Sequence, residues 1–245
     1  MVNTQDDDLS QQLNAALEAD PRLDLRRHPI GIRSEGGQLR LEGEVPDVAC
    51  KRIACAAAQR VAGDWPVVDA LRLAPAEPRS DRQVRDALAN ALLHQRELHN
   101  CTVRQQDHGR REFLQEAHDD WPSGEIELQV EDGEIVLTGK VISLSHKRMI
   151  EALAWRTPGC RNVVDRLQVV PAEDDNDDEL TDAIRLVLEM DPHVHADQLG
   201  VRSEDGVVTL AGVLRRDEEK QLAEMDAWSV WGVRDVRNRI EVRAS

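Results

Sequence analysis

Three lysines stand at equivalent places in a repeated pattern: Lys51, Lys147 and Lys220. Arg52 and Arg148 directly follow two of them. Ammonium and guanidinium groups bind phosphate oxygens well, so these side chains are candidates for contacting a phospholipid headgroup. The alternative interpretation is that each lysine is a solvated residue on an exposed helix face, and the sequence leaves both open.

A second set of polar residues, Asp69, Asp165 and Asn238, alternates in phase with apolar neighbours such as Leu71. Each should therefore point to the same sheet face as the core residues, where a polar group needs a hydrogen-bond partner. The interpretation that we favour is a structural hydrogen bond to the backbone near a hairpin.

Metal chemistry is not expected. The acidic run from Glu173 to Glu179 could attract cations, but it lacks the glycine and the distal glutamate of a calcium loop. We interpret it as a solvated linker whose last acids stabilise the start of a helix. The histidines at 94, 99, 108 and 118 have spacings that match no standard ligand pattern and are interpreted as part of an irregular polar insert.

Catalysis is not expected either. The chain contains no nucleophile elbow, P-loop or dinucleotide fingerprint. The four cysteines show no Cys-x-x-Cys or zinc spacing and are predicted to be buried thiols: Cys50, Cys55, Cys101 and Cys160. We expect no enzyme, no metal and no cofactor.

The composition limits the partners. The chain of 245 residues has a net charge of −16 and only 2% aromatic residues. Residues 173–245 carry 19 acids and 9 bases by count, so they hold −10 of that charge. A net acidic chain repels phosphate backbones, and nucleic acid is not an expected partner. With no signal peptide at the start and no apolar run long enough to span a bilayer, we expect a cytoplasmic protein that is not transmembrane.

A strand pattern, Gly-x-apolar-x-Leu-x-Gly, organises the chain. It occurs at 37–43, 133–139 and 206–212, and shifts of 96 and 73 residues superpose the flanking apolar positions as well. Amphipathic helical patterns precede each copy, and a helix and a short strand follow it. Acidic-Gly turns such as Asp132-Gly133 predict hairpins. A third set of glycines is predicted to form left-handed helix caps: Gly63, Gly159 and Gly232.

These elements predict an α+β fold of three tandem αββαβ units, each with a three-stranded mixed sheet and two helices on one face. The predicted domains are 1–76, 77–173 and 174–245. The structural glycines of the strand pattern are Gly37, Gly43, Gly133, Gly139, Gly206 and Gly212. The second unit carries an insertion near 98–123, in which Arg111 to Asp120 could form a short helix.

Tryptophans mark the ends of two units. Trp155 and Trp228 occupy equivalent positions near the end of the second helix, and Trp231 stands just before Gly232. Packing in the core or between units is one interpretation. Docking to a membrane interface or to a partner is the other.

The repeat resembles the BON domain. The resemblance rests on the Gly-x-Val-x-Leu-x-Gly strand and on the segments 158–167 and 231–240, which read PGCRNVVDRL and WGVRDVRNRI. The three copies together look like the osmotically inducible protein Y family. The resemblance implies a non-catalytic binding or adaptor protein that acts in osmotic or envelope stress through a protein partner. It also implies two alternatives, namely peripheral phospholipid binding and potassium sensing.

Overall fold

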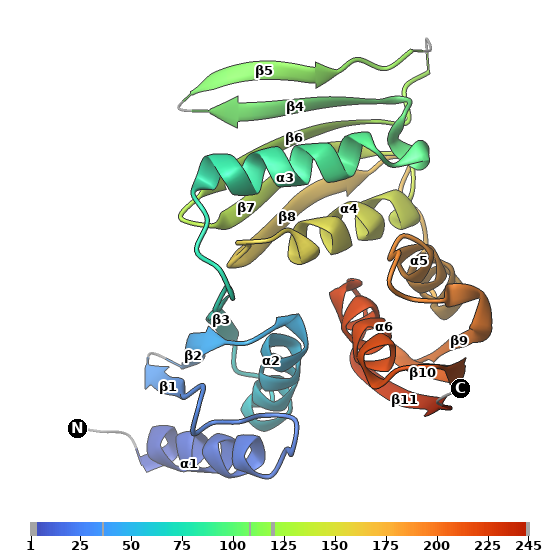
Figure 1. Cartoon of the computed structure of the whole chain (residues 1–245). Coiled ribbons are helices and arrows are strands. Elements are labelled where there is room, and N and C mark those ends of the chain that lie inside the picture. The colour runs from blue at the N-terminus through green and yellow to red at the C-terminus, as the bar shows by residue number, and fades with distance from the viewer. Residues whose placement is uncertain (1–3, 36, 108, 119–120, 244–245) are drawn as a thin grey trace. The chain divides into compact units, whose positions relative to one another are not determined.

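The computed structural model describes residues 4–35, 37–107, 109–118 and 121–243, and side chains from Asp8 onward except that of Glu35. The chain divides into two compact units, Met1–Ala74 and Pro75–Ser245. The first contains repeat one, and the second contains repeats two and three (Figure 1).

Repeat one is the predicted unit. Helix α1 (Thr4–Glu18) precedes the hairpin of β1 (Ile30–Glu35) and β2 (Gln38–Val45), and α2 (Val48–Ala62) leads to β3 (Val67–Leu73). The sheet order is β1-β2-β3, with β1 antiparallel and β3 parallel to β2. Alternate residues such as Leu39 and Leu41 are fully buried against the helices. This alternation is what a sheet with one covered face requires.

Repeat two has the same helices and strands plus one more hairpin. Helix α3 (Asp81–Leu93) and a 3₁₀ turn (η1, Arg96–Leu98) precede β4 (Cys101–Asp107) and β5 (Arg110–Gln115). The hairpin of β6 (Gly124–Glu131) and β7 (Glu134–Val141), helix α4 (Leu144–Arg156) and β8 (Asn162–Val169) follow. The sheet therefore has five strands in the order β5-β4-β6-β7-β8, with α3 and α4 on one face (Figure 1).

The α+β class is confirmed, but the three-stranded sheet predicted for repeat two is wrong. The short helix predicted from Arg111 is also wrong, because residues 110–115 form strand β5; Asp119 and Asp120 lie outside the described residues. Strand β4 pairs in parallel with β6, so that Cys101 and Val103 join the core. A parallel pairing joins segments that are distant in sequence and leaves no local signature.

Repeat three returns to three strands. Helix α5 (Asp177–Glu189) and a 3₁₀ turn (η2, Ala196–Gln198) lead to β9 (Leu199–Glu204), β10 (Val207–Leu214), helix α6 (Asp217–Ser229) and β11 (Asp235–Val242). The sheet order is β11-β10-β9. Helix α4 of repeat two packs on both α5 and α6, so repeats two and three share a helical interface. In the described part of the chain, no helix is both long and apolar enough to cross a membrane.

The glycines of the strand pattern have two separate tasks. The first glycine, as in Gly133 (φ 72°), completes a hairpin turn in which Asp132 also has positive φ (51°). The second permits close approach of the neighbouring strand, since a Cβ on Gly139 would lie 1.9 Å from the carbonyl oxygen of Glu125. Of the predicted helix caps, only Gly63 directly follows its helix. Gly159 and Gly232 lie two residues beyond the cap residues of α4 and α6.

Candidate functional site

The three equivalent lysines point inward to the last strand of their own repeats. Lys51 Nζ donates to Asp69 Oδ1 at 2.8 Å and to the carbonyl oxygen of Leu71. The other two ammonium groups donate to the carbonyl oxygens at the equivalent strand positions, each at 2.8 Å: Lys147 to Leu167, and Lys220 to Ile240. The second helix of every repeat is thus tied to the last strand by the same contact.

The polar strand residues complete this contact. Asp69, Asp165 and Asn238 each accept a hydrogen bond from the amide two residues further along their own strand. Asp165 also lies 3.6 Å from Lys147 Nζ. Burial raises the pKa of Asp165, while the Leu167 amide and Lys147 act in the opposite direction. The lysines and these residues were interpreted separately from sequence, yet they form one motif.

This geometry supports a third interpretation, in which each lysine is a structural residue that ties the second helix to the last strand. Lys51 is buried, so it is not the solvated helix residue that one interpretation required. Because all three ammonium groups already have internal acceptors, a headgroup contact would have to compete with these bonds. The headgroup contact stays a prediction, and so does any such role for Arg52, which is half-buried on α2.

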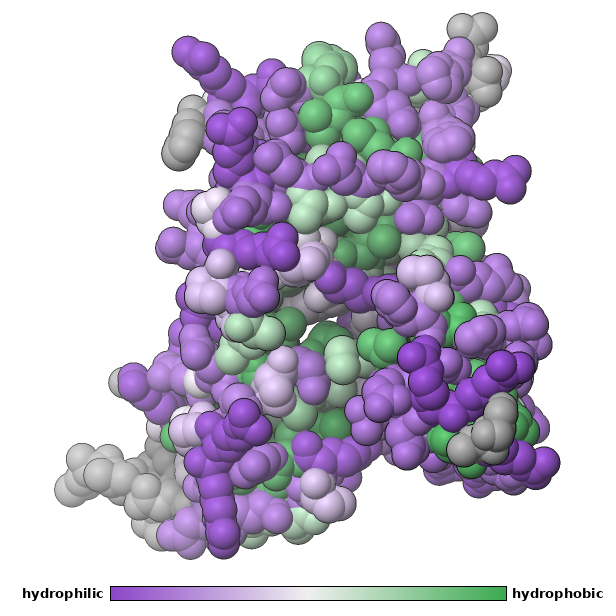
Figure 2. Space-filling model, in the orientation of Figure 1, coloured by the Kyte–Doolittle hydropathy of each residue, from purple (hydrophilic) through white to green (hydrophobic). Residues whose placement is uncertain are grey.

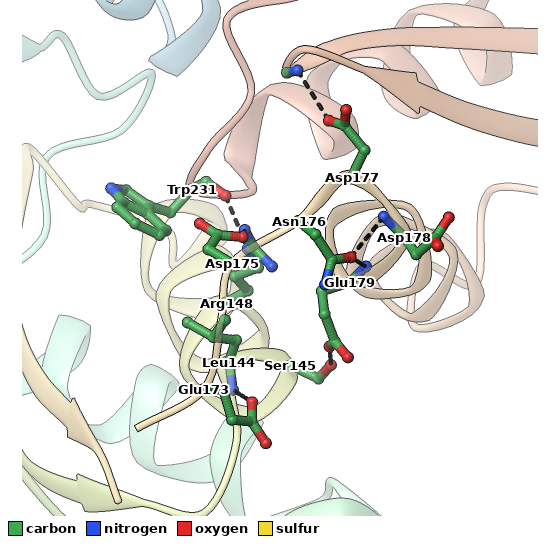
Figure 3. Close-up of polar contacts among 11 residues, drawn as sticks. Leu144, Ser145, Arg148, Glu173, Asp175, Asn176, Asp177, Asp178, Glu179 and Trp231 are labelled. Carbon is green, nitrogen blue, oxygen red and sulfur yellow. Dashed lines mark hydrogen bonds and ion pairs between the residues drawn. The ribbon is translucent and has the colours of Figure 1, made fainter. Parts of the chain in front are cut away.

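The environment of the Arg148 side chain differs from that of the lysines. Its side chain is only 1% exposed and reaches from α4 to repeat three, where Nε donates to the carbonyl oxygen of Trp231 at 3.0 Å. A terminal nitrogen binds Asp175 in the segment that joins the repeats (Figure 3). The guanidinium also lies 5.6 Å from the centre of the Trp231 ring. Arg148 therefore fastens repeat two, the connecting segment and repeat three together.

The acidic segment is more ordered than the predicted solvated linker. Glu173 accepts the Leu144 amide at the start of α4 at 2.7 Å, and Asn176 caps α5 (Figure 3). Asp177 and the two acids after it lie in the first turn of α5, as predicted from the helix dipole. Asp175 binds Arg148 and Glu179 accepts from the Ser145 hydroxyl, so several carboxylates of this exposed segment contact the helix starts of repeats two and three.

One aspartate in each of repeats two and three holds the hairpin turn. Asp81 at the start of α3 accepts the amides of Asp132 and Gly133, and Asp177 at the start of α5 accepts those of Asp205 and Gly206. The two amides lower the pKa of Asp177. Sequence reasoning missed this contact, although both aspartates stand three residues before the first apolar residue of their helix.

The cysteines and histidines considered as candidates do not form a common reactive or metal site among the described residues. Cys50, Cys101 and Cys160 are buried free thiols as predicted, whereas Cys55 is half-buried. Burial raises the pKa of both Cys50 and Cys55 to about 12, which suppresses the reactive thiolate. Among the described residues, no group of three or more His, Cys, Asp or Glu side chains could hold a metal ion. His108 lies outside the described residues.

The matching tryptophans serve packing. Trp228 is 1% exposed, and Trp155 is half-buried against the core of repeat two. Trp231 is 46% exposed beside Arg148 and Lys147.

Sequence reasoning missed an exposed apolar cluster at one end of the five-stranded sheet, here called the apolar end: Trp121, Ile142 and Val170. Their exposed fractions are 88%, 43% and 50%. Backbone bonds bring them to the same end, because the Ile142 amide donates to Ser123 and the Val170 amide donates to Val141. The signal lay in the apolar pairs 141–142 and 169–170 at strand ends, since adjacent strand residues cannot both face the core.

The insertion adds further apolar surface. Phe113 on β5 is 62% exposed and stacks with Arg104, whose guanidinium carbon lies 4.7 Å from the ring centre. Figure 2 shows a largely hydrophilic surface on which hydrophobic residues gather over β4 and β5, where the sheet extends past α3. The insertion thus enlarges the sheet and exposes apolar side chains outside the shared αββαβ core.

The BON domain family matches three ranges of the chain, residues 5–75, 110–171 and 176–244. These ranges include most of the sequence, so the chain belongs to the BON family as a tandem protein with three copies of the domain.

No curated protein matches the chain. Among solved structures, it is similar to CdsD, a structural protein of the type III secretion system of Chlamydia trachomatis, with 14% identity and a TM-score of 0.26 over 97% of this chain and 93% of that one. The C-terminal domain of CdsD matches with 14% identity and a TM-score of 0.25 over 96% and 98% of the two chains. At these TM-scores the likeness carries no argument about fold or function.

Proposed function

We propose that this chain is a non-catalytic adaptor that acts in the cytoplasm, in osmotic or envelope stress, by docking a protein partner on the apolar end of repeat two. The exposure of Trp121 supports this proposal most directly. A tryptophan that is 88% exposed, at an end of the sheet that also exposes two aliphatic side chains, is unusual for a surface that stays in water. Aromatic anchors of this kind supply most of the binding energy at protein interfaces.

A site-specific photo-crosslinker at position 142 tests the proposal in cells that make the protein. We expect one protein adduct that forms again between purified components. Trp121→Ser should then weaken the measured affinity by about thirtyfold, since a central aromatic anchor contributes ~2 kcal/mol or more. The variant should fold normally because the ring makes few contacts. Met225→Ser is the matched control, since it removes an exposed apolar side chain from repeat three. Unchanged affinity of Trp121→Ser would exclude the apolar end as the docking surface.

Peripheral phospholipid binding is the second candidate, and the same tryptophan favours it, because amphipathic indole rings settle at membrane interfaces. The net charge of −16 opposes binding to anionic lipid. Flotation with neutral and anionic vesicles at low and physiological salt separates the candidates. Binding that persists at physiological salt and is lost in Trp121→Ser would support the lipid candidate over the protein partner.

Potassium sensing is the third candidate, which the family resemblance suggests. Thermal unfolding in potassium against sodium at equal ionic strength tests it. A higher melting temperature in potassium alone would support this candidate.

A further inference from the structure

A cluster of three charged groups lies at the interface between repeats two and three, apart from the apolar end. Arg156 at the end of α4 binds Asp191 Oδ2 at 2.8 Å and lies 3.3 Å from Asp226 Oδ1. Asp191 follows α5, and Asp226 lies on α6, so the cluster joins three elements of two repeats. The two carboxyl groups are 5% and 4% exposed.

The charges of this cluster do not balance when both acids are ionised. One guanidinium then faces two buried carboxylates, and the remaining oxygen of Asp226, Oδ2, is buried without a hydrogen-bond partner. An unpaired buried carboxylate is costly, whereas one proton shared by the two acids makes the cluster neutral. Asp191 is also held in place, since its Oδ1 accepts the His193 amide at 2.8 Å.

We propose that Arg156, Asp191 and Asp226 form a pH-sensitive clasp, which holds repeats two and three together while one proton is bound and loosens when that proton leaves.

Other charged groups on the same elements have partners of their own. On α4, Arg148 binds Asp175, and Glu151 accepts a hydrogen bond from Trp155. Around α5, Arg185 binds Asp182. On α6, the remaining pairings are Glu219 with Arg216 and His195, Glu224 with Asn238, and Lys220 with the Ile240 carbonyl. The clasp proton is therefore governed mainly by its three members.

The direction of the pH effect follows from the protonation of Asp226. Burial raises the pKa of Asp226 from 3.8 to about 7, Arg156 opposes this rise, and the negative charge of Asp191 adds to it. The closed clasp thus keeps a proton that the open clasp would lose near pH 4. Closing is favoured most at low pH, and the preference disappears as the pH rises through about 7. Between these values, opening should increase by up to about tenfold per pH unit.

Fluorescence energy transfer across the interface in the full chain tests the proposal. Exposed Arg166 and Arg237, one on the sheet of each repeat, are replaced by cysteine and labelled. The native thiols are buried or half-buried, which limits their labelling. We expect the transfer efficiency to change as the pH rises from about 4 to about 7 and to stay constant above about 7. Asp226→Asn, which mimics the protonated acid, should abolish the change. Glu218→Gln, an exposed acid on the same helix, should behave like the parent protein.

A second variant gives an independent test. Asp191→Asn removes a charge that adds to the effect of burial on the pKa of Asp226, so the transition should move to lower pH. Circular dichroism confirms that each variant is folded. A constant transfer efficiency in the parent protein, or a transition that survives in Asp226→Asn with the same midpoint, would overturn the clasp.

Discussion

Replacing Lys51 by methionine separates the structural role of the lysines from a headgroup contact. The substitution keeps the length of the side chain but removes bonds to Asp69 and to the Leu71 carbonyl. Breaking a fully buried ion pair costs roughly 3–5 kcal/mol. Asp69 is 36% exposed, so water can solvate it again, and we expect a smaller loss of about 2 kcal/mol in the stability of the first unit.

The measurement is urea-dependent hydrogen exchange of the full chain, with peptides from α2 and β3 reporting on the first unit. With a slope near 1 kcal/mol per M urea, the midpoint should fall by about 2 M. Peptides of the second unit should not change. Gln59→Met, at an exposed position of the same helix, is the matched control and should alter stability by no more than about 0.5 kcal/mol.

The equivalent lysines extend this test, because the residues beside them differ. Lys147 is 3.6 Å from Asp165, which is only 10% exposed, whereas the equivalent residue in repeat three is Asn238 instead of an acid. The loss should therefore be smallest in Lys220→Met, which leaves no carboxylate without its partner. A loss in Lys51→Met no larger than that in Gln59→Met would refute the structural role. Reduced vesicle binding without reduced stability would instead support the headgroup contact.

Three further predictions follow from single contacts. Gly139→Ala should destabilise the second unit strongly, because the added Cβ would overlap the Glu125 carbonyl oxygen. Gly109→Ala should cost only about 1–2 kcal/mol, because an added Cβ there meets no atom within 4 Å and only the positive φ is unfavourable. Urea unfolding of the two variants compares the losses of stability, and equal losses would contradict this prediction. Arg148→Met should lower the free energy of unfolding of the second unit by ~2 kcal/mol and increase hydrogen exchange in α5 and α6, because the contacts with Trp231 and Asp175 are lost. Unchanged hydrogen exchange in these helices would contradict the role of Arg148 in holding repeats two and three together. Because the pKa of Asp177 is lowered by folding, the ionised Asp177 stabilises the folded protein above pH 3.8, its ordinary pKa, and this stabilisation is lost as the pH falls below that value. Asp177→Asn should therefore reduce the fall in the free energy of unfolding at acidic pH, as measured in a stability–pH curve.

Local patterns predicted the repeat architecture because the relevant interactions are short in sequence. The turn at Asp132-Gly133, the alternation of β6 and β7 and the helix after them each depend on neighbouring residues. The repetition of these patterns at constant shifts then made the αββαβ unit evident. The insertion was misread because β4 gains its stability by pairing with β6, about 23 residues away in register, and not from its own sequence.

The candidate site was predicted as a set of residues but not as an arrangement. The lysines and the Asp69 group were both identified by repeat position, yet their mutual contact depends on how the second helix packs on the last strand. The exposure of Trp121 and the cluster at Arg156 had no sequence signature that was recognised.

The sequence by itself determined the family, the order of the elements in the shared αββαβ unit and the turns at the strand glycines, because periodicity and turn chemistry act over a few residues. The tertiary structure alone decided that Lys51 faces inward, that β4 and β5 extend the second sheet, and that Asp191 and Asp226 share Arg156 between two repeats. Burial and ion pairing between distant segments decide these features. Both depend on the surroundings that the folded chain creates around a residue and not on the residues beside it in sequence.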